Sequence, residues 1–286
     1  MEGCSLRIGR GLYNLIMNTN CSELQTYLST AIEAAHRGGE ILESWRKRFN
    51  VREKARADLV TEADEASQAA IRERLLSAFP EHMFLGEEGS FGQEHEALRP
   101  PPDAPPTWVV DPLDGTANYV HDLPAYCVSI GLWMNGQPTI GVIYDPRQRE
   151  LFTAVLGQGA FLNGEPIRVS ETSSIRDSLL CTGFPSNYEA MRPNLDAWDR
   201  VSAVAQGLRR TGSTALNLAY VACGRFDGFW AYTNWAWDVM AGAVLVTEAG
   251  GSIIGIRGEP FDPFNPHGIA TNRLIERELF LALNPQ

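Results

Sequence analysis

Apolar residues near the start of the chain recur at the three- and four-residue steps of an amphipathic helix. The helix predicted from Ser22 has its apolar face at Leu24, Leu28, Ala31, Ile32, Ala35, Leu42 and Trp45. A second helix is predicted from Thr61, because Thr-Glu-Ala-Asp has the form of a capping box, and Pro80 ends it. The pattern therefore predicts a pair of helices ahead of any long strand.

The pattern then changes to strands. Apolar runs at 107–111, 126–134 and 139–144 predict strands, and Asn135-Gly136 between the last two is typical of a tight hairpin. Asn163-Gly164 predicts another such turn. From about residue 175, strands alternate with helices. We therefore expect an extension at 1–21, a helix pair plus antiparallel sheet over 22–170, and an alternating α/β part over 171–286.

Composition and charge narrow the function. The 286 residues are 44% hydrophobic and 21% charged, as in globular proteins, and the net charge of −11 disfavours nucleic acid and anionic membranes as partners. The five cysteines are scattered and form no CxxC pair, which favours a reducing compartment. Without a membrane-length apolar run or a signal peptide, a cytoplasmic location is expected.

Acidic residues cluster around one strand end. An apolar strand delivers Asp111, and Asp114 follows three residues later in Asp-Pro-Leu-Asp-Gly-Thr. Gly115 and Thr116 then begin a short helix whose first N–H groups can bind a phosphate oxygen. Together these residues suit a site for metal and phosphate. The alternative is a simple Asp-Gly turn in which aspartate caps the helix.

Other acids also lie at the ends of apolar strands or at the starts of helices. Glu87 follows an apolar strand and a glycine, although adjacent glutamates are usually solvated loop charge. Asp238 enters an apolar, buried helix, where a carboxylate needs a metal or partner, or serves as a cap. The capping box accounts for Asp64, which leaves Asp58 as the better candidate to orient a hydroxyl or a water molecule.

The chain resembles the inositol monophosphatase-like, lithium-sensitive, Mg²⁺-dependent phosphatases. The segments that carry the resemblance are DLVTEAD (58–64), GEE (86–88), WVVDPLDGTANYVHDLP (108–124) and WDVMAGAVLVTEAGG (237–251). With it, the expected fold is α+β or α/β, a layered α-β-α-β-α sandwich of two sheets with paired helices. A homodimer is expected as well.

The resemblance implies two or three Mg²⁺ ions and a role for each acid. Glu87, Asp111 and the Leu113 carbonyl would hold one ion, and Asp111, Asp114 and Asp238 a second. A metal-activated water would attack phosphorus. The implied catalytic residues are Glu87, Asp58 and Thr116, with Thr116 hydrogen-bonded to Asp58. The residues implied to contact substrate or phosphate are Asp114, Gly115, Thr116, Ala231 and Asp238.

One position departs from the family's pattern. Members that cleave inositol phosphate place a glutamate seven residues before the Trp-Asp aspartate, and this chain has Ala231 there. The substrate is therefore expected to be inositol-1-phosphate or a related small sugar or polyol phosphate. The alternatives are fructose-1,6-bisphosphate, histidinol phosphate, adenosine-3′,5′-bisphosphate, or a non-catalytic role in binding polyol phosphates. A bisphosphate would need extra cations, for which only Arg209, Arg210 and Arg225 cluster.

Overall fold

The computed structural model describes residues 21–55, 58–90, 93–185, 188–265 and 267–285, so the predicted N-terminal extension lies outside it except for Cys21. Within these ranges the chain forms seven α-helices: α2 (Cys21–Trp45), α3 (Glu62–Ala78), α4 (Thr116–Val120), α5 (Tyr188–Ser202), α6 (Thr214–Ala222), α7 (Ala236–Glu248) and α8 (Glu276–Leu283). Two short 3₁₀ turns, η1 (His95–Leu98) and η2 (Ile175–Asp177), accompany them.

The larger sheet has seven strands in sequence order: β3 (Met83–Gly86), β4 (Thr107–Asp114), β5 (Cys127–Met134), β6 (Gln137–Asp145), β7 (Glu150–Val155), β8 (Gly159–Leu162) and β9 (Glu165–Pro166). Among the described strands of this sheet, only β3 and β4 pair in parallel, and the other neighbouring strands are antiparallel. The predicted hairpin is confirmed, because Met134 pairs with Gln137 and the two turn residues have positive φ angles of 54° and 77°. The turn at Asn163-Gly164 has the same form, with φ angles of 50° and 85°.

The smaller sheet has five strands in the order β11 (Gly207–Arg209), β10 (Leu179–Thr182), β12 (Gly228–Ala231), β14 (Gly268–Thr271) and β13 (Ser252–Gly255). A separate hairpin, β1 (Val51–Ala55) with β2 (Asp58–Thr61), precedes α3. The sequence pattern did not predict this hairpin, because its strands are short and mostly polar.

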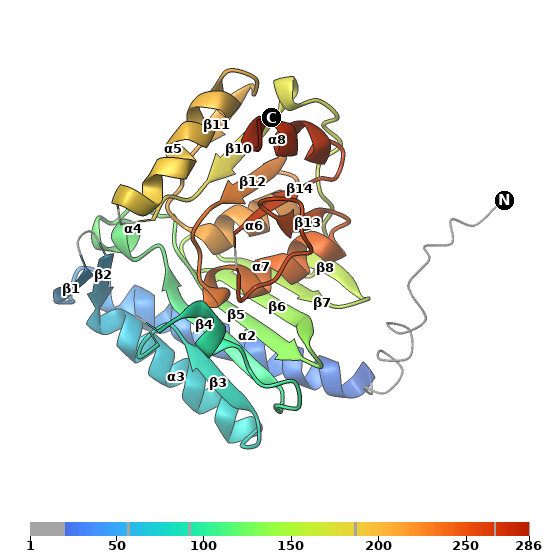
Figure 1. Ribbon diagram of the computed structural model, residues 1–286. Coiled ribbons are helices and arrows are strands. Elements are labelled where there is room, and N and C mark those ends of the chain that lie inside the picture. Colours follow the sequence, from blue (N-terminus) through green and yellow to red (C-terminus); the bar gives the residue numbers. More distant parts are fainter. Residues whose placement is uncertain (1–20, 56–57, 91–92, 186–187, 266, 286) are drawn as a thin grey trace.

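The layers follow the expected order (Figure 1). Helices α2 and α3 cover the outer face of the larger sheet, α6 and α7 lie between the two sheets, and α5 and α8 cover the smaller sheet. The predicted α-β-α-β-α sandwich of two sheets with paired helices is confirmed. In the part of the chain that the structure describes, no helix is long and apolar enough to cross a membrane.

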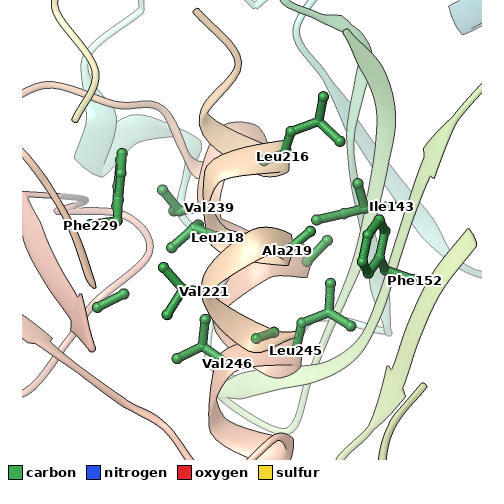
Figure 2. Packing of buried hydrophobic residues seen from close by; sticks show 14 of the residues in the cluster. Ile143, Phe152, Leu216, Leu218, Ala219, Val221, Phe229, Val239, Leu245 and Val246 are labelled. Carbon is green, nitrogen blue, oxygen red and sulfur yellow. The ribbon is translucent and has the colours of Figure 1, made fainter. Parts of the chain in front are cut away.

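The apolar core between the sheets is built on α6 and α7 (Figure 2). Ile143 and Phe152 reach it from the larger sheet, and Phe229 reaches it from the smaller one. Burying such side chains contributes about 1.5–3 kcal/mol each relative to leaving them exposed. Both sheets therefore pack against the same pair of helices, and this shared core fixes the positions of α6 and α7 between them.

Two glycines bring α7 unusually close to the larger sheet. A methyl group at Gly141 would lie 2.3 Å from the Ala241 carbonyl oxygen, and one at Gly131 would lie 2.3 Å from Met240 Cγ. Both contacts are far shorter than van der Waals separation, so α7 can occupy this position only over residues without a side chain.

Replacing Gly141 with alanine should therefore destabilise the protein by about 1–3 kcal/mol, because the obstructing atom is main chain and cannot rotate away. Urea unfolding would measure the loss. The matched control is Gly207→Ala in β11, where the nearest atom to an added methyl is 3.4 Å away. Equal stability changes for the two variants would contradict the close approach of α7.

Candidate active site

A bulge in β4 places two aspartates on one face of the larger sheet. Asp111 pairs with Ser129, and Asp114 pairs with Cys127, so three steps along β4 oppose two steps along β5. Without the extra residue, side chains three positions apart would point to opposite faces. The sequence predicted a strand that ends at Asp111 and a loop beyond it. The strand instead continues through Asp114, and the bulge, rather than a loop, brings both carboxylates to one side.

Asp111 is a buried acid on which three other acids act through their negative charge. Its side chain is 3% exposed, and one carboxylate oxygen accepts the Leu113 N–H at 2.9 Å. Burial raises its pKa well above the usual range, and the negative charges of Glu87, Asp114 and Asp238 raise it further. The four acids that the sequence indicated as metal ligands therefore come close enough to repel one another.

The carboxylate of Asp114 connects the two halves of the chain. It accepts hydrogen bonds from Ser213 Oγ at 2.5 Å and from the N–H groups of Thr214 and Ala215 at 3.2 and 2.6 Å. It thus caps α6, which begins a hundred residues later. Burial raises the pKa of Asp114 to about 6, although these hydrogen bonds oppose the shift.

The other two acids approach from separate elements. Asp238 lies in the first turn of α7 and accepts the Trp235 N–H at 2.7 Å, so it caps its own helix, and its negative charge helps to raise the pKa of Asp111. Glu87 directly follows β3, and its N–H donates to the Val110 carbonyl at 3.0 Å, which extends the parallel pairing with β4. Both are partly buried.

The donor set fits Mg²⁺, which prefers carboxylate and carbonyl oxygens and keeps several water ligands. Three acids, Glu87, Asp114 and Asp238, act on the buried Asp111 through their negative charge. Within the described ranges, however, no three acids, histidines or cysteines form a group already arranged to hold an ion. Asp111, Asp114 and Asp238 each accept a main-chain N–H in this structure.

Thr116 hydrogen-bonds to Asp64, whereas the sequence predicted a bond to Asp58. Thr116 Oγ1 lies 3.2 Å from Asp64 Oδ1 and 3.1 Å from the Leu113 carbonyl oxygen. The Asp58 side chain lies outside the described residues, so its predicted role stays a prediction. Thr116 thus has Asp64 as a hydrogen-bond partner, so the view that Asp64 serves only as a cap is corrected.

Asp64 is fully buried and serves two neighbours. Its other oxygen accepts the Thr61 N–H at 2.9 Å and the Thr61 hydroxyl at 2.6 Å, which completes the predicted capping box of α3. The pKa of Asp64 is raised to about 7, chiefly by burial and also by the negative charges of Glu87 and Glu88, while the bonds from Thr61 oppose the shift. A carboxyl group with a pKa near neutral can exchange a proton at working pH.

Gly115 is needed between the strand and the short helix. Its φ angle is 99°, and a methyl group there would lie 2.9 Å from the Ala125 carbonyl oxygen. Thr116 then begins α4, as the sequence predicted, and the N–H groups of this first turn have no acceptor within the helix. The turn and helix start expected for phosphate contact are therefore present next to Asp114.

The residues considered for substrate selection, Ala231, Arg210 and Arg225, are each buried or in contact with other side chains. Ala231 ends β12, is fully buried, and belongs to the core on the α6–α7 side of the smaller sheet. Arg225 forms a two-pronged ion pair with Glu150 at 2.5 and 2.6 Å, so a phosphate would have to compete with this carboxylate. Arg210 lies over the Phe184 ring. These contacts weaken the case for a bisphosphate substrate.

The comparisons with known proteins agree with this geometry. A model described as the inositol monophosphatase family matches residues 23–285. An inositol-1-monophosphatase of Synechocystis is 44% identical over 92% of this chain and 90% of its own. A Nus factor SuhB of Pseudomonas aeruginosa is 39% identical, with 92% and 97% covered. The crystal structure of the extragenic suppressor protein SuhB from Bartonella henselae has a TM-score of 0.81 at 36% identity, with 90% and 98% covered.

Proposed function

Because the chain belongs to the inositol monophosphatase family, we propose that it is a Mg²⁺-dependent phosphomonoesterase for inositol-1-phosphate or a related small sugar or polyol phosphate. The observation that supports this most is the position of Asp111, a buried acid whose pKa is raised by burial and by three further acids. Such a concentration of negative charge is stable with divalent cations and costly without them. A Nus-factor role, the name of one relative, has no comparable support in the described residues.

The proposed assignment of ligands is the one that the resemblance to the family implies. Glu87, Asp111 and the Leu113 carbonyl would hold one Mg²⁺, and Asp111, Asp114 and Asp238 a second. When bound, Mg²⁺ would supply Lewis-acid polarisation of the phosphoryl group and activation of the attacking water. A non-catalytic binding protein would have no need for this complete set of acids.

The chain's own groups would orient and deprotonate the water. Thr116 Oγ1 lies within hydrogen-bond distance of two acceptors, Asp64 Oδ1 and the Leu113 carbonyl oxygen, and can donate its single proton to either of them. Asp64 would accept the proton that the Thr116 hydroxyl gives up as Thr116 takes one from the water. The N–H groups of Gly115, which precedes α4, and of Thr116, its first residue, would bind the phosphate.

Release of inorganic phosphate from a substrate panel tests the proposal. Protein stripped of metal with a chelator should be inactive, and Mg²⁺ should restore hydrolysis of inositol-1-phosphate and 2-glycerophosphate. Turnover of fructose-1,6-bisphosphate, histidinol phosphate and adenosine-3′,5′-bisphosphate should be weaker. Lithium should inhibit the Mg²⁺-restored activity. Failure of Mg²⁺ to restore release from every ester would rule out the proposed function.

Ala231→Glu should improve the use of inositol phosphate relative to 2-glycerophosphate. Ala231 ends β12, seven residues before Asp238, and the resemblance implies that a glutamate at this position would bind ring hydroxyls, which glycerophosphate lacks. One added hydrogen bond to a charged group should change the ratio of kcat/KM values by about tenfold or more.

The neutral variant Ala231→Gln is the control for this substitution, because a buried glutamate also carries a desolvation cost. It should move the ratio in the same direction by a smaller factor, and thermal unfolding would show whether either variant has lost stability. A parent already selective for inositol phosphate, or an unchanged ratio in both variants, would place specificity elsewhere.

A further inference from the structure

One face of α3 contacts three segments that carry the proposed site. Asp64, Ser67 and Gln68 are spaced at i, i+3 and i+4, so their side chains lie on the same side of the helix. Asp64 accepts a hydrogen bond from the Thr116 hydroxyl, as described above. Ser67 is fully buried and its hydroxyl donates to the Pro112 carbonyl, inside the β4 bulge, at 3.1 Å.

Gln68 makes the third and most specific of these contacts. Its amide nitrogen donates to the Glu88 carbonyl at 2.8 Å, and its amide oxygen accepts the Glu88 N–H at 2.9 Å. A single side chain therefore binds both main-chain groups of the residue that follows Glu87. The two partners are separated by 20 positions along the chain.

Gly86 shows that this contact leaves no spare room. A methyl group at Gly86 would lie 2.2 Å from Gln68 Oε1 and 2.7 Å from Gln68 Cδ. Glu87 is thus held on both sides, by the close packing of Gly86 against Gln68 and by the hydrogen bonds at Glu88. Its own N–H is bonded to Val110 in the neighbouring strand.

We propose that Gln68 is a positioning residue that keeps the Glu87 carboxylate next to Asp111 so that Mg²⁺ can bind between them. This inference rests on the proposed function. The Glu87 segment lies in a turn, and the like charge of Asp111 repels it, so it needs an attachment to a rigid element. Helix α3 supplies that attachment from the same face that contacts Thr116 and Pro112.

Gln68→Met tests the role, because methionine has a similar length and no amide. The Mg²⁺ concentration for half-maximal activity should rise by about tenfold or more, as for other groups that orient metal ligands. Turnover at saturating Mg²⁺ should stay within about threefold of the parent, since the groups around Thr116 are unchanged. Calorimetric titration of the metal-free protein with Mg²⁺ should show the same loss of affinity without any substrate.

Hydrogen exchange of the Glu88 amide in the metal-free protein gives a separate readout. Its protection should fall in Gln68→Met, whereas the Val110-bonded amide of Glu87 should lose less. Gln68→Asn, whose amide is too short to span both groups, should behave like Gln68→Met and serves if methionine impairs folding. The control is Gln25→Met on α2, which removes a glutamine hydrogen bond to Gln158 at a distant exposed site and should leave all three measurements unchanged.

The outcomes separate the two proposals. A parent that binds Mg²⁺ and a Gln68→Met variant with the same Mg²⁺ affinity would overturn the positioning role, whether or not the Glu88 amide had lost its protection. A parent that neither binds Mg²⁺ nor hydrolyses phosphate esters would overturn the proposed function itself, and the positioning role with it. Weaker Mg²⁺ binding with nearly unchanged saturated turnover supports the inference.

Discussion

Asp111→Asn should lower turnover at saturating Mg²⁺ by at least about 10²–10³-fold while the protein stays folded. Asp111 is the acid that the proposed assignment gives to both ions, so neutralising it weakens two sites together. Asparagine has the same shape, and its carbonyl oxygen can still accept the Leu113 N–H. Steady-state phosphate release over a range of Mg²⁺ concentrations would measure the loss.

The same substitution should stabilise the metal-free protein. The pKa of Asp111 is raised in the folded state, so folding stability from this group is fully present below about pH 4 and declines as pH rises through the folded pKa. Asparagine carries no charge and removes that decline. The melting temperature of the metal-free variant at pH 8 should exceed that of the parent by about 2 °C or more.

Asp145→Asn is the matched control for both measurements. Asp145 is fully buried at the end of β6, and burial raises its pKa to about 6. Its neutralisation should also stabilise the protein at pH 8 but leave turnover unchanged. If Asp111→Asn kept activity within tenfold of the parent, or the two variants behaved alike in turnover, the assignment of Asp111 as a metal ligand would be wrong.

Thr116→Val should reduce kcat by about 10²–10⁴-fold with a smaller change in KM, because it removes the hydroxyl held between Asp64 and the Leu113 carbonyl. The side chains have nearly the same shape, and Asp64 keeps both bonds from Thr61, so stability should change little. Rates of phosphate release and thermal unfolding would be compared.

Thr116→Ser keeps the hydroxyl and should retain most of the activity. A second pair, Asp64→Asn and Asp58→Asn, distinguishes the partner that the structure indicates from the one that the sequence indicated. Loss of kcat in Asp64→Asn supports the proposed proton relay. A Thr116→Val enzyme with nearly normal kcat, or a loss confined to Asp58→Asn, would refute it.

The layers of the fold could be predicted because each depends on a local signal. The helix pair shows three- and four-residue spacing, and the hairpins are marked by Asn-Gly turns whose positive φ angles few other residues adopt readily. The β1–β2 hairpin could not be predicted in this way. Its strands are four and five residues long, and tertiary contacts rather than pattern decide their conformation.

The site was predicted in its composition and only partly in its connections. Asp111, Asp114 and Asp238 drew attention because acids at strand and helix ends are unusual beside apolar runs, whereas the metal role of Glu87 came from the resemblance to the family. The role of Asp64 was missed because a capping box already accounted for it, and Thr116 lies 52 positions away. One signal was present: Ser67 and Asp64 are polar residues on the face of α3 that the core should occupy.

The shared carboxylate of Asp114 should decide how long a cation stays. A carboxylate offers about four lone-pair positions. At Asp114, three donors from the start of α6 already bond to the two carboxylate oxygens. A cation bound there has to divide the same oxygens with the helix, so neither partner receives the full interaction. We expect an ion that exchanges readily with the solution and is lost on dialysis, closer to a co-substrate than to a permanent part of the protein.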